Sequence, residues 1–144
     1  MLHMKPRISV LTLGVSDLEK SVEFYREGLG FATEGIIGKE FANGAVAFFD
    51  LQSGIKLALW SRESMSNDTG IPLQRSSALE FTIGHNVVTK EEVNTVMELA
   101  EKIGAKIIKP AQDTFWGGYT GYFQDPDGHL WEIVYNPHLI PDSK

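Results

Sequence analysis

Apolar and polar residues follow the same order of elements twice along this chain. Residues 7–14 alternate as in a half-buried strand, and residues 78–84 alternate in the same way. A helical pattern follows each strand. Its apolar positions are Leu18, Val22, Tyr25 and Leu29 in the first copy and Val93, Val96, Ala100 and Ile103 in the second. The repeated strand and helix predict an internally duplicated fold.

Both predicted helices begin at a capping box, in which a hydroxyl side chain is followed three residues later by glutamate. Ser16 and Glu19 form the first box, and Thr89 and Glu92 form the second. Glycines then end the helices, at positions 28 and 30 in the first copy and 104 in the second.

Three strand-like runs follow each helix. They lie at 31–36, 45–51 and 55–60 in the first copy and at 106–109, 119–124 and 130–135 in the second. The sequence therefore predicts an α+β fold of two β-α-β-β-β modules in a single domain. Module 1 is expected at about 6–61 and module 2 at about 78–137, with a polar linker at about 62–77.

Composition and charge narrow the classes of partner. The length of 144 residues suits one globular domain, and 13 basic against 19 acidic residues give a net charge of −6. Without a basic run, neither nucleic acid nor an anionic membrane is an expected partner. The chain has no cysteine, which excludes disulfides and thiolate metal sites. No long apolar segment is present, so we expect a cytoplasmic protein.

The hairpin at 119–135 contains the strongest candidate site residue. Asp125-Pro126-Asp127-Gly128 supplies its turn, because proline presets the backbone and glycine accepts a positive φ. Glu132 then lies within an otherwise apolar strand, where a carboxylate is costly to bury unless it has a partner. Trp131 has the opposite parity and is predicted to pack beneath the helices.

Two segments of the chain resemble the vicinal oxygen chelate superfamily, which includes glyoxalase I, bleomycin-resistance proteins, fosfomycin-resistance enzymes and extradiol dioxygenases. Residues 10–25 with Leu-Gly-Phe at 29–31 resemble its opening strand and helix. Tyr-Phe-Gln-Asp-Pro-Asp-Gly-His-Leu-Trp-Glu at 122–132 resembles its closing hairpin. The resemblance implies curled mixed sheets around a ligand cavity, often completed in a homodimer, with a small organic molecule as partner.

The resemblance also implies four metal-ligand positions, on the first and last strands of the two modules. Glu132 matches one of them. The other three are occupied by Val10, Ala58 and Glu80, of which the first two have no donor atom. Glu80 is matched to Val10 because Thr82-Ile83-Gly84 resembles Thr12-Leu13-Gly14. None of the four histidines falls on a ligand position. We therefore expect no cofactor, and a divalent metal held by Glu132 with other ligands is the alternative.

Glu80 and Glu132 are the candidate catalytic residues, because they are predicted to lie on the first and last strands of module 2. Two neighbouring carboxylates favour a shared proton, a bound cation or an anionic clamp for a cationic ligand. Each glutamate is otherwise expected to bond a nearby threonine, tyrosine, tryptophan, water or lysine such as Lys56.

Aromatic side chains near the predicted strands favour a flat organic ligand. The candidate ligand-binding residues are Trp60, Trp116, Tyr122, Phe41 and Lys56. Trp116 precedes two glycines and is predicted to lie in a rim or lid.

The leading hypothesis is a small-molecule binder, or a metal-free enzyme, that lacks the family's histidine-rich shell. The first alternative is a lyase resembling lactoylglutathione lyase, or a dioxygenase, with a non-standard metal-ligand set. The second is a structural or regulatory dimer with a vestigial cavity. Because one fold hosts many activities, the resemblance alone does not decide among them.

Overall fold

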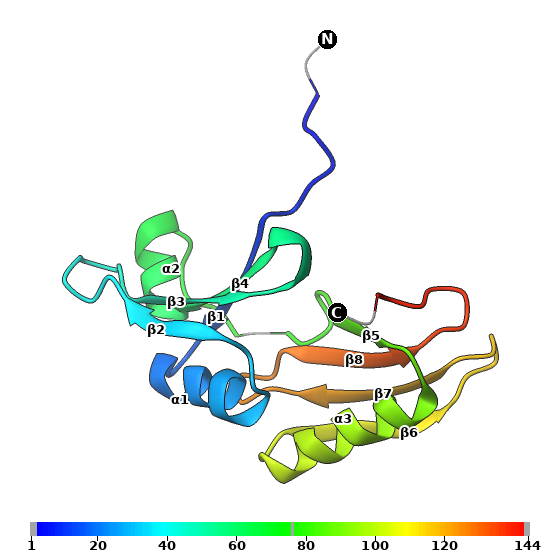
Figure 1. The fold of residues 1–144 in the computed structure, drawn as a ribbon. Coiled ribbons are helices and arrows are strands. Elements are labelled where there is room, and N and C mark those ends of the chain that lie inside the picture. Colours follow the sequence, from blue (N-terminus) through cyan, green and yellow to red (C-terminus); the bar gives the residue numbers. More distant parts are fainter. Residues whose placement is uncertain (1–2, 76, 143–144) are drawn as a thin grey trace. The chain divides into compact units, whose positions relative to one another are not determined.

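The computed structural model describes residues 3–75 and 77–142 (Figure 1). The chain divides into two compact units, unit 1 at Met1–Gln74 and unit 2 at Arg75–Lys144. Each unit contains one four-stranded mixed sheet and at least one helix, so the predicted α+β class is confirmed. Within the described residues, no helix combines the length and the hydropathy needed to cross a membrane.

Unit 1 contains a strand, a helix and three further strands, followed by a second helix. The elements are β1 (Val10–Val15), α1 (Leu18–Glu23), the π-helical turn η1 (Phe24–Gly28), β2 (Thr33–Ile37), β3 (Val46–Asp50), the short 3₁₀ turn η2 (Gln52–Gly54), β4 (Lys56–Ser61) and α2 (Arg62–Thr69). The strand order is β1-β4-β3-β2, with β1 and β4 parallel and the other pairs antiparallel.

Unit 2 repeats this topology with one helix. Its elements are β5 (Ile83–Val87), α3 (Lys90–Lys102), β6 (Lys106–Asp113), β7 (Tyr119–Gln124) and β8 (Leu130–Tyr135). The order β5-β8-β7-β6 again has one parallel pair, β5 with β8. The predicted repeat of β-α-β-β-β is therefore present in both units.

Helices cover both faces of the unit 1 sheet. On one face the Tyr25 ring of η1 lies 5.9 Å from the Phe49 ring of β3, and both side chains are fully buried. On the other face α2 lies over Gly14, because a Cβ there would be 3.0 Å from Arg62 Cγ and 3.1 Å from Met65 Sδ. α2 lies within residues 62–77, where the sequence predicted a polar linker.

In unit 2, α3 covers one face of the sheet. Gly121 of β7 allows Met97 of α3 to pack closely against the sheet, since a Cβ at position 121 would lie 3.0 Å from Met97 Cε. Trp131 is buried on the same face and stacks on Phe123 with ring centroids 6.1 Å apart. The prediction that Trp131 packs beneath a helix is confirmed.

The N-cap of the second capping box is confirmed, although Glu92 Oε2 accepts from the Val88 amide over 3.4 Å rather than from Thr89. The first box is corrected. Thr89 is the N-cap of α3, and its Oγ1 accepts a hydrogen bond from the Glu92 amide over 3.1 Å. The N-cap of α1 is Asp17 rather than Ser16, and its Oδ1 accepts from the Lys20 amide over 3.1 Å. The negative charge of a carboxylate interacts favourably with the positive end of the helix dipole, which favours Asp17 over Ser16 as the N-cap.

Two predicted strands have different bounds in the structure. The strand expected at 78–84 is β5, which begins only at Ile83, because residues 78–80 form a turn and a bend. The strand expected at 106–109 continues to Asp113 as β6. Pro110 is tolerated there because β6 is an edge strand whose register shifts between Lys109 and Gln112, so no ladder donor is required.

We predict that Thr89→Ala lowers the free energy of unfolding by about 1 kcal/mol, because the first turn of α3 loses its side-chain acceptor. Urea unfolding followed by circular dichroism measures the change. Thr95→Ala is the matched control, since Thr95 lies within α3 and bonds only the Glu91 carbonyl of its own helix. A loss of stability in the control equal to that of Thr89→Ala would contradict the capping role.

Candidate functional site

Glu132 lies on the face of the unit 2 sheet opposite to α3. Side chains alternate along a strand, so the buried Trp131 and Ile133 point toward α3 while Glu132 points away. Glu132 is half-buried. The parity argument from the sequence therefore holds for β8.

Tyr122 is the partner of Glu132 across β7 and β8. The two residues face each other in the strand register, and Tyr122 Oη donates a hydrogen bond to Glu132 Oε2 over 2.9 Å. Burial, together with the hydrogen bond and the negative charge of Glu132, raises the pKa of Tyr122. Tyr122 thus remains a donor at neutral pH.

Only one oxygen of the Glu132 carboxylate is engaged by this bond. Across residues 3–75 and 77–142, no further hydrogen bond or ion pair to Glu132 is found. A half-buried carboxylate with one oxygen fixed and the other available accepts an incoming donor. The expectation that Glu132 bonds a tyrosine, tryptophan, threonine or lysine is met by Tyr122.

The same row of the sheet continues on both sides of this pair. Lys109 of β6 faces Tyr122, and Gly84 of β5 faces Glu132. Cross-strand partners project from the same face, so Lys109, Tyr122 and Glu132 form a polar row that ends at a glycine. The sequence did not indicate that Lys109 or Gly84 belongs to this row. The place of Lys109 depends on the register shifts in β6, and the place of Gly84 depends on the late start of β5.

The predicted pairing of Glu80 with Glu132 in the sheet is wrong. Glu80 is exposed and lies in a bend before β5, whereas the residue beside Glu132 is Gly84. The sequence comparison had matched Thr82 with Thr12. In the parallel pairs, Val15 lies opposite Ser61 at the end of β4, and Val87 lies opposite Tyr135 at the end of β8. Val87 therefore corresponds to Val15, and counting back five residues matches Thr82 with Val10.

Unit 1 holds three of the predicted ligand-binding residues. Trp60 is half-buried in β4, and its Nε1 donates to the Asn43 carbonyl over 2.8 Å. Lys56 is exposed and pairs with its cross-strand neighbour Asp50 rather than with a glutamate. Phe41 is exposed in the loop between β2 and β3. No interaction found among the described residues brings these three side chains together.

Trp116 lies in the turn between β6 and β7. A Cβ at Gly118 would be 2.1 Å from the Trp116 ring, so the indole packs directly on the Gly118 backbone. Phe115 beside it is fully exposed. The predicted loop position of Trp116 is confirmed, and its role as a rim or lid stays a prediction.

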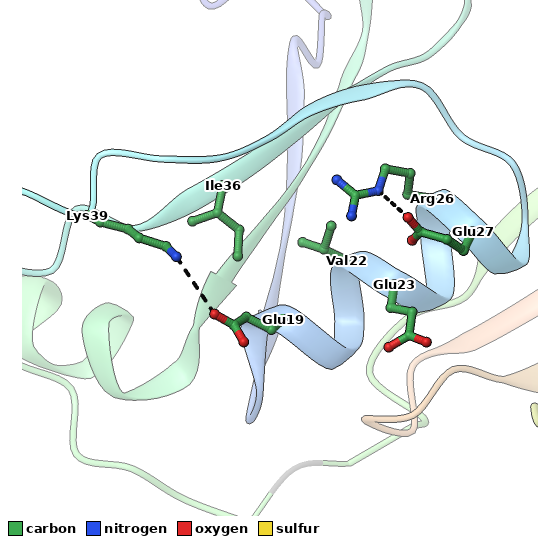
Figure 2. Close-up of a pocket in the computed structure, with 7 residues that line it drawn as sticks. All are labelled: Glu19, Val22, Glu23, Arg26, Glu27, Ile36 and Lys39. Carbon is green, nitrogen blue, oxygen red and sulfur yellow. Dashed lines mark hydrogen bonds and ion pairs between the residues drawn. The ribbon is translucent and has the colours of Figure 1, made fainter.

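The larger described hollow lies elsewhere, between α1 with η1 and the β2 strand of unit 1. Its volume is about 530 Å³. Figure 2 shows the residues that line it, which are Glu19, Val22, Glu23, Arg26, Glu27, Ile36 and Lys39. Arg26 pairs with Glu27 at 2.7 Å and Lys39 with Glu19 at 3.7 Å, and all four side chains are about half exposed or more. Exposed ion pairs of this kind contribute little to the free energy of folding. The charged walls of this hollow differ from the aromatic-lined ligand cavity expected from the sequence.

The turn that leads into β8 is fixed by a buried carboxylate. Asp125 Oδ1 accepts from the amides of Asp127 over 2.9 Å and His129 over 2.8 Å, and Oδ2 lies 2.6 Å from His129 Nδ1. The sequence predicted this turn from Pro126 and Gly128 and did not indicate that His129 would join Asp125. Their spacing of four residues across a Pro-Asp-Gly turn was the available signal.

The residues at the metal-ligand positions do not fit a transition-metal shell. By strand register these positions hold Val10, Ala58, Thr82 and Glu132, so a single carboxylate is accompanied by one hydroxyl and two side chains without donors. In the part of the chain that the structure describes, no group of three or more histidine, aspartate or glutamate side chains is arranged to hold an ion.

Comparisons with known proteins agree with the fold. A family model described as the Glyoxalase/Bleomycin resistance protein/Dioxygenase superfamily matches residues 7–133. A glyoxalase-related enzyme from Fulvimarina pelagi is 36% identical, with a TM-score of 0.78 over 92% of this chain and 89% of that one. A glyoxalase/bleomycin resistance protein/dioxygenase from Nocardioides is 27% identical, with a TM-score of 0.76 over 99% and 92%. The uncharacterized protein YraH of Bacillus subtilis is 28% identical over 127 residues, which cover 85% of this chain and 93% of YraH.

We predict that Tyr122 ionises above the ordinary tyrosine pKa of about 10. The difference in alkaline absorbance between the wild type and Tyr122→Phe isolates its titration. Glu132→Gln lowers the midpoint toward the ordinary value but not fully, because burial remains. Since the folded pKa is raised, the stabilising contribution is complete below about pH 10 and is lost as the pH rises through the folded pKa. An unshifted Tyr122 midpoint in the wild type would contradict the bond to Glu132.

Proposed function

The chain belongs to the Glyoxalase/Bleomycin resistance protein/Dioxygenase superfamily, and we propose that it binds a small organic molecule on the Glu132 face of the unit 2 sheet. The observation that carries this proposal is the hydrogen bond from Tyr122 to Glu132, on the face opposite to α3. A carboxylate held in one orientation by a phenol is prepared to accept a donor from a ligand without reorganising.

The proposed site works without the family's metal shell. Its support is the donor set, since Val10 and Ala58 have no ligand atoms and Glu132 is the one carboxylate at the four positions. A carboxylate beside a phenol can accept hydrogen bonds and take a proton from a bound molecule, and neither role requires a metal. Glu132 is therefore the residue on which both binding and any metal-free reaction depend.

A homodimer and a cytoplasmic location remain predictions. The family resemblance supports the first, and the sequence composition supports the second. The ligand is proposed to be flat, because the site lies on a sheet surface and Tyr122 supplies an aromatic edge beside the carboxylate.

We predict that a compound that raises the melting temperature of the wild type binds Glu132→Gln roughly tenfold more weakly, because the amide loses the charge-assisted hydrogen bond. Tyr122→Phe has a smaller effect, since it frees an oxygen but keeps the charge. A thermal-shift screen of aromatic amines, vicinal diols and 2-oxo acids finds the compound, and calorimetry measures affinity. Glu101→Gln, an exposed change on α3, is the control and leaves affinity unchanged. Equal affinities for wild type and Glu132→Gln would reject this site.

We also predict that protein purified without chelator contains far less than one divalent metal ion per chain. Elemental analysis of the wild type and Glu132→Gln provides the measurement. Stoichiometric metal that disappears in the variant would favour a metal-dependent lyase or dioxygenase instead. An intact dimer that no compound stabilises would favour a structural role.

A further inference from the structure

We infer that Gly84, Asn86 and Glu132 form a slot for a planar cation of the amidinium or guanidinium type. This inference rests on the proposed function and names the chemical class of its ligand. It comes from three features of the unit 2 sheet: the open backbone at Gly84, two acceptor side chains beside it, and the place of Lys109 in the same cross-strand row.

Gly84 leaves open space on the sheet surface. A Cβ at Gly84 would meet only Asn86 Oδ1, at 3.9 Å, within 4 Å. The glycines of the sheets at positions 14 and 121 differ, because there α2 and α3 pack against the backbone at about 3 Å. Gly84 also has no positive φ that would exclude a side chain. Within the described part of unit 2, neither packing nor backbone conformation requires glycine at this position.

A glycine without such a requirement inside a strand marks a place where another group approaches the backbone. The corresponding position in unit 1 is Thr12, which has a side chain. The bare backbone at Gly84 therefore forms a floor, with Glu132 beside it on β8 and Asn86 two residues along β5.

Both neighbours of this floor present an acceptor oxygen while another atom of the same side chain is hydrogen-bonded. Asn86 Nδ2 donates to the Leu139 carbonyl over 3.4 Å, which turns Asn86 Oδ1 toward Gly84. Tyr122 holds Glu132 Oε2, which leaves Oε1 available. Two acceptors, one of them an anion, select a ligand with several N–H donors and positive charge. A planar group also fits against the flat peptide surface of Gly84.

The charge distribution along the row agrees with a cation at this end. Lys109 lies on β6, two strands from Glu132, at a backbone distance of about 10 Å. The positive charge is thus at the far end of the row, and Tyr122 separates it from the slot. A cation at Gly84 meets the carboxylate without approaching the ammonium group.

Benzamidine is the probe, and its neutral isostere benzamide is the matched comparison. Amide resonances of the full-length protein, followed by nuclear magnetic resonance during titration, give the affinity and the residues perturbed. Benzamidine is expected to shift Gly84, Asn86 and Glu132 and to bind roughly tenfold more tightly than benzamide.

Gly84→Val fills the slot and is expected to weaken benzamidine roughly tenfold, while valine's strand preference keeps the unfolding midpoint equal or higher. Gly84→Ala adds one methyl group and is the second variant, with a smaller loss, should valine disturb folding. Thr12→Val, at the matching register position in unit 1, is the control and leaves binding unchanged.

The outcomes separate this inference from the proposed function. Benzamide binding as tightly as benzamidine, or benzamidine failing to bind, overturns the cation slot. A screened compound that depends on Glu132 yet binds Gly84→Val and Gly84→Ala unchanged also overturns it, and leaves the proposed function standing.

Discussion

The alternation of side chains along β8 is the constraint on which the rest of unit 2 depends. Trp131 and Ile133 are buried against α3, and Glu132 between them must face the other way. A shift of one residue in the pairing of β8 would turn Glu132 toward α3. The same shift would turn Trp131 and Ile133 to the opposite face of the sheet. The buried side chains therefore fix the site residue, and the Asp125 turn fixes where the strand begins.

Much of this fold can be predicted from the sequence because its signals are local. The order of elements, the α3 cap at Thr89 and the closing hairpin all follow from periodicity, capping chemistry and turn residues within a few positions. The α1 cap was misplaced by one residue, since Ser16 and Asp17 are both good caps and only the path of the chain decides between them. The polar composition of residues 62–69 concealed α2, which begins after the N-cap Ser61 and ends at Gly70 in a left-handed conformation.

The site was predicted only in part, because its neighbours are set by strand register. The sequence indicated Glu132 as a candidate site residue because a carboxylate within an apolar strand is unusual. It indicated Tyr122 as one of several aromatic candidates for ligand binding. Glu80 was chosen because Thr82-Ile83-Gly84 resembles Thr12-Leu13-Gly14, yet the sheets align these triplets two residues apart. Buried positions such as Val15 and Val87 carry the register, and a similar triplet on exposed positions does not.

The two sheets share a topology, but α2 makes them unequal. In unit 1 the position that matches Asn86 is Gly14, which lies beneath Arg62 and Met65, and the position that matches Gly84 has the Thr12 side chain. α2 thus covers the backbone at this position in one copy of the repeat, whereas Gly84 has open space above it in the other. Under the proposed function, a chain built from two similar halves would therefore take up one ligand at these matching positions rather than two.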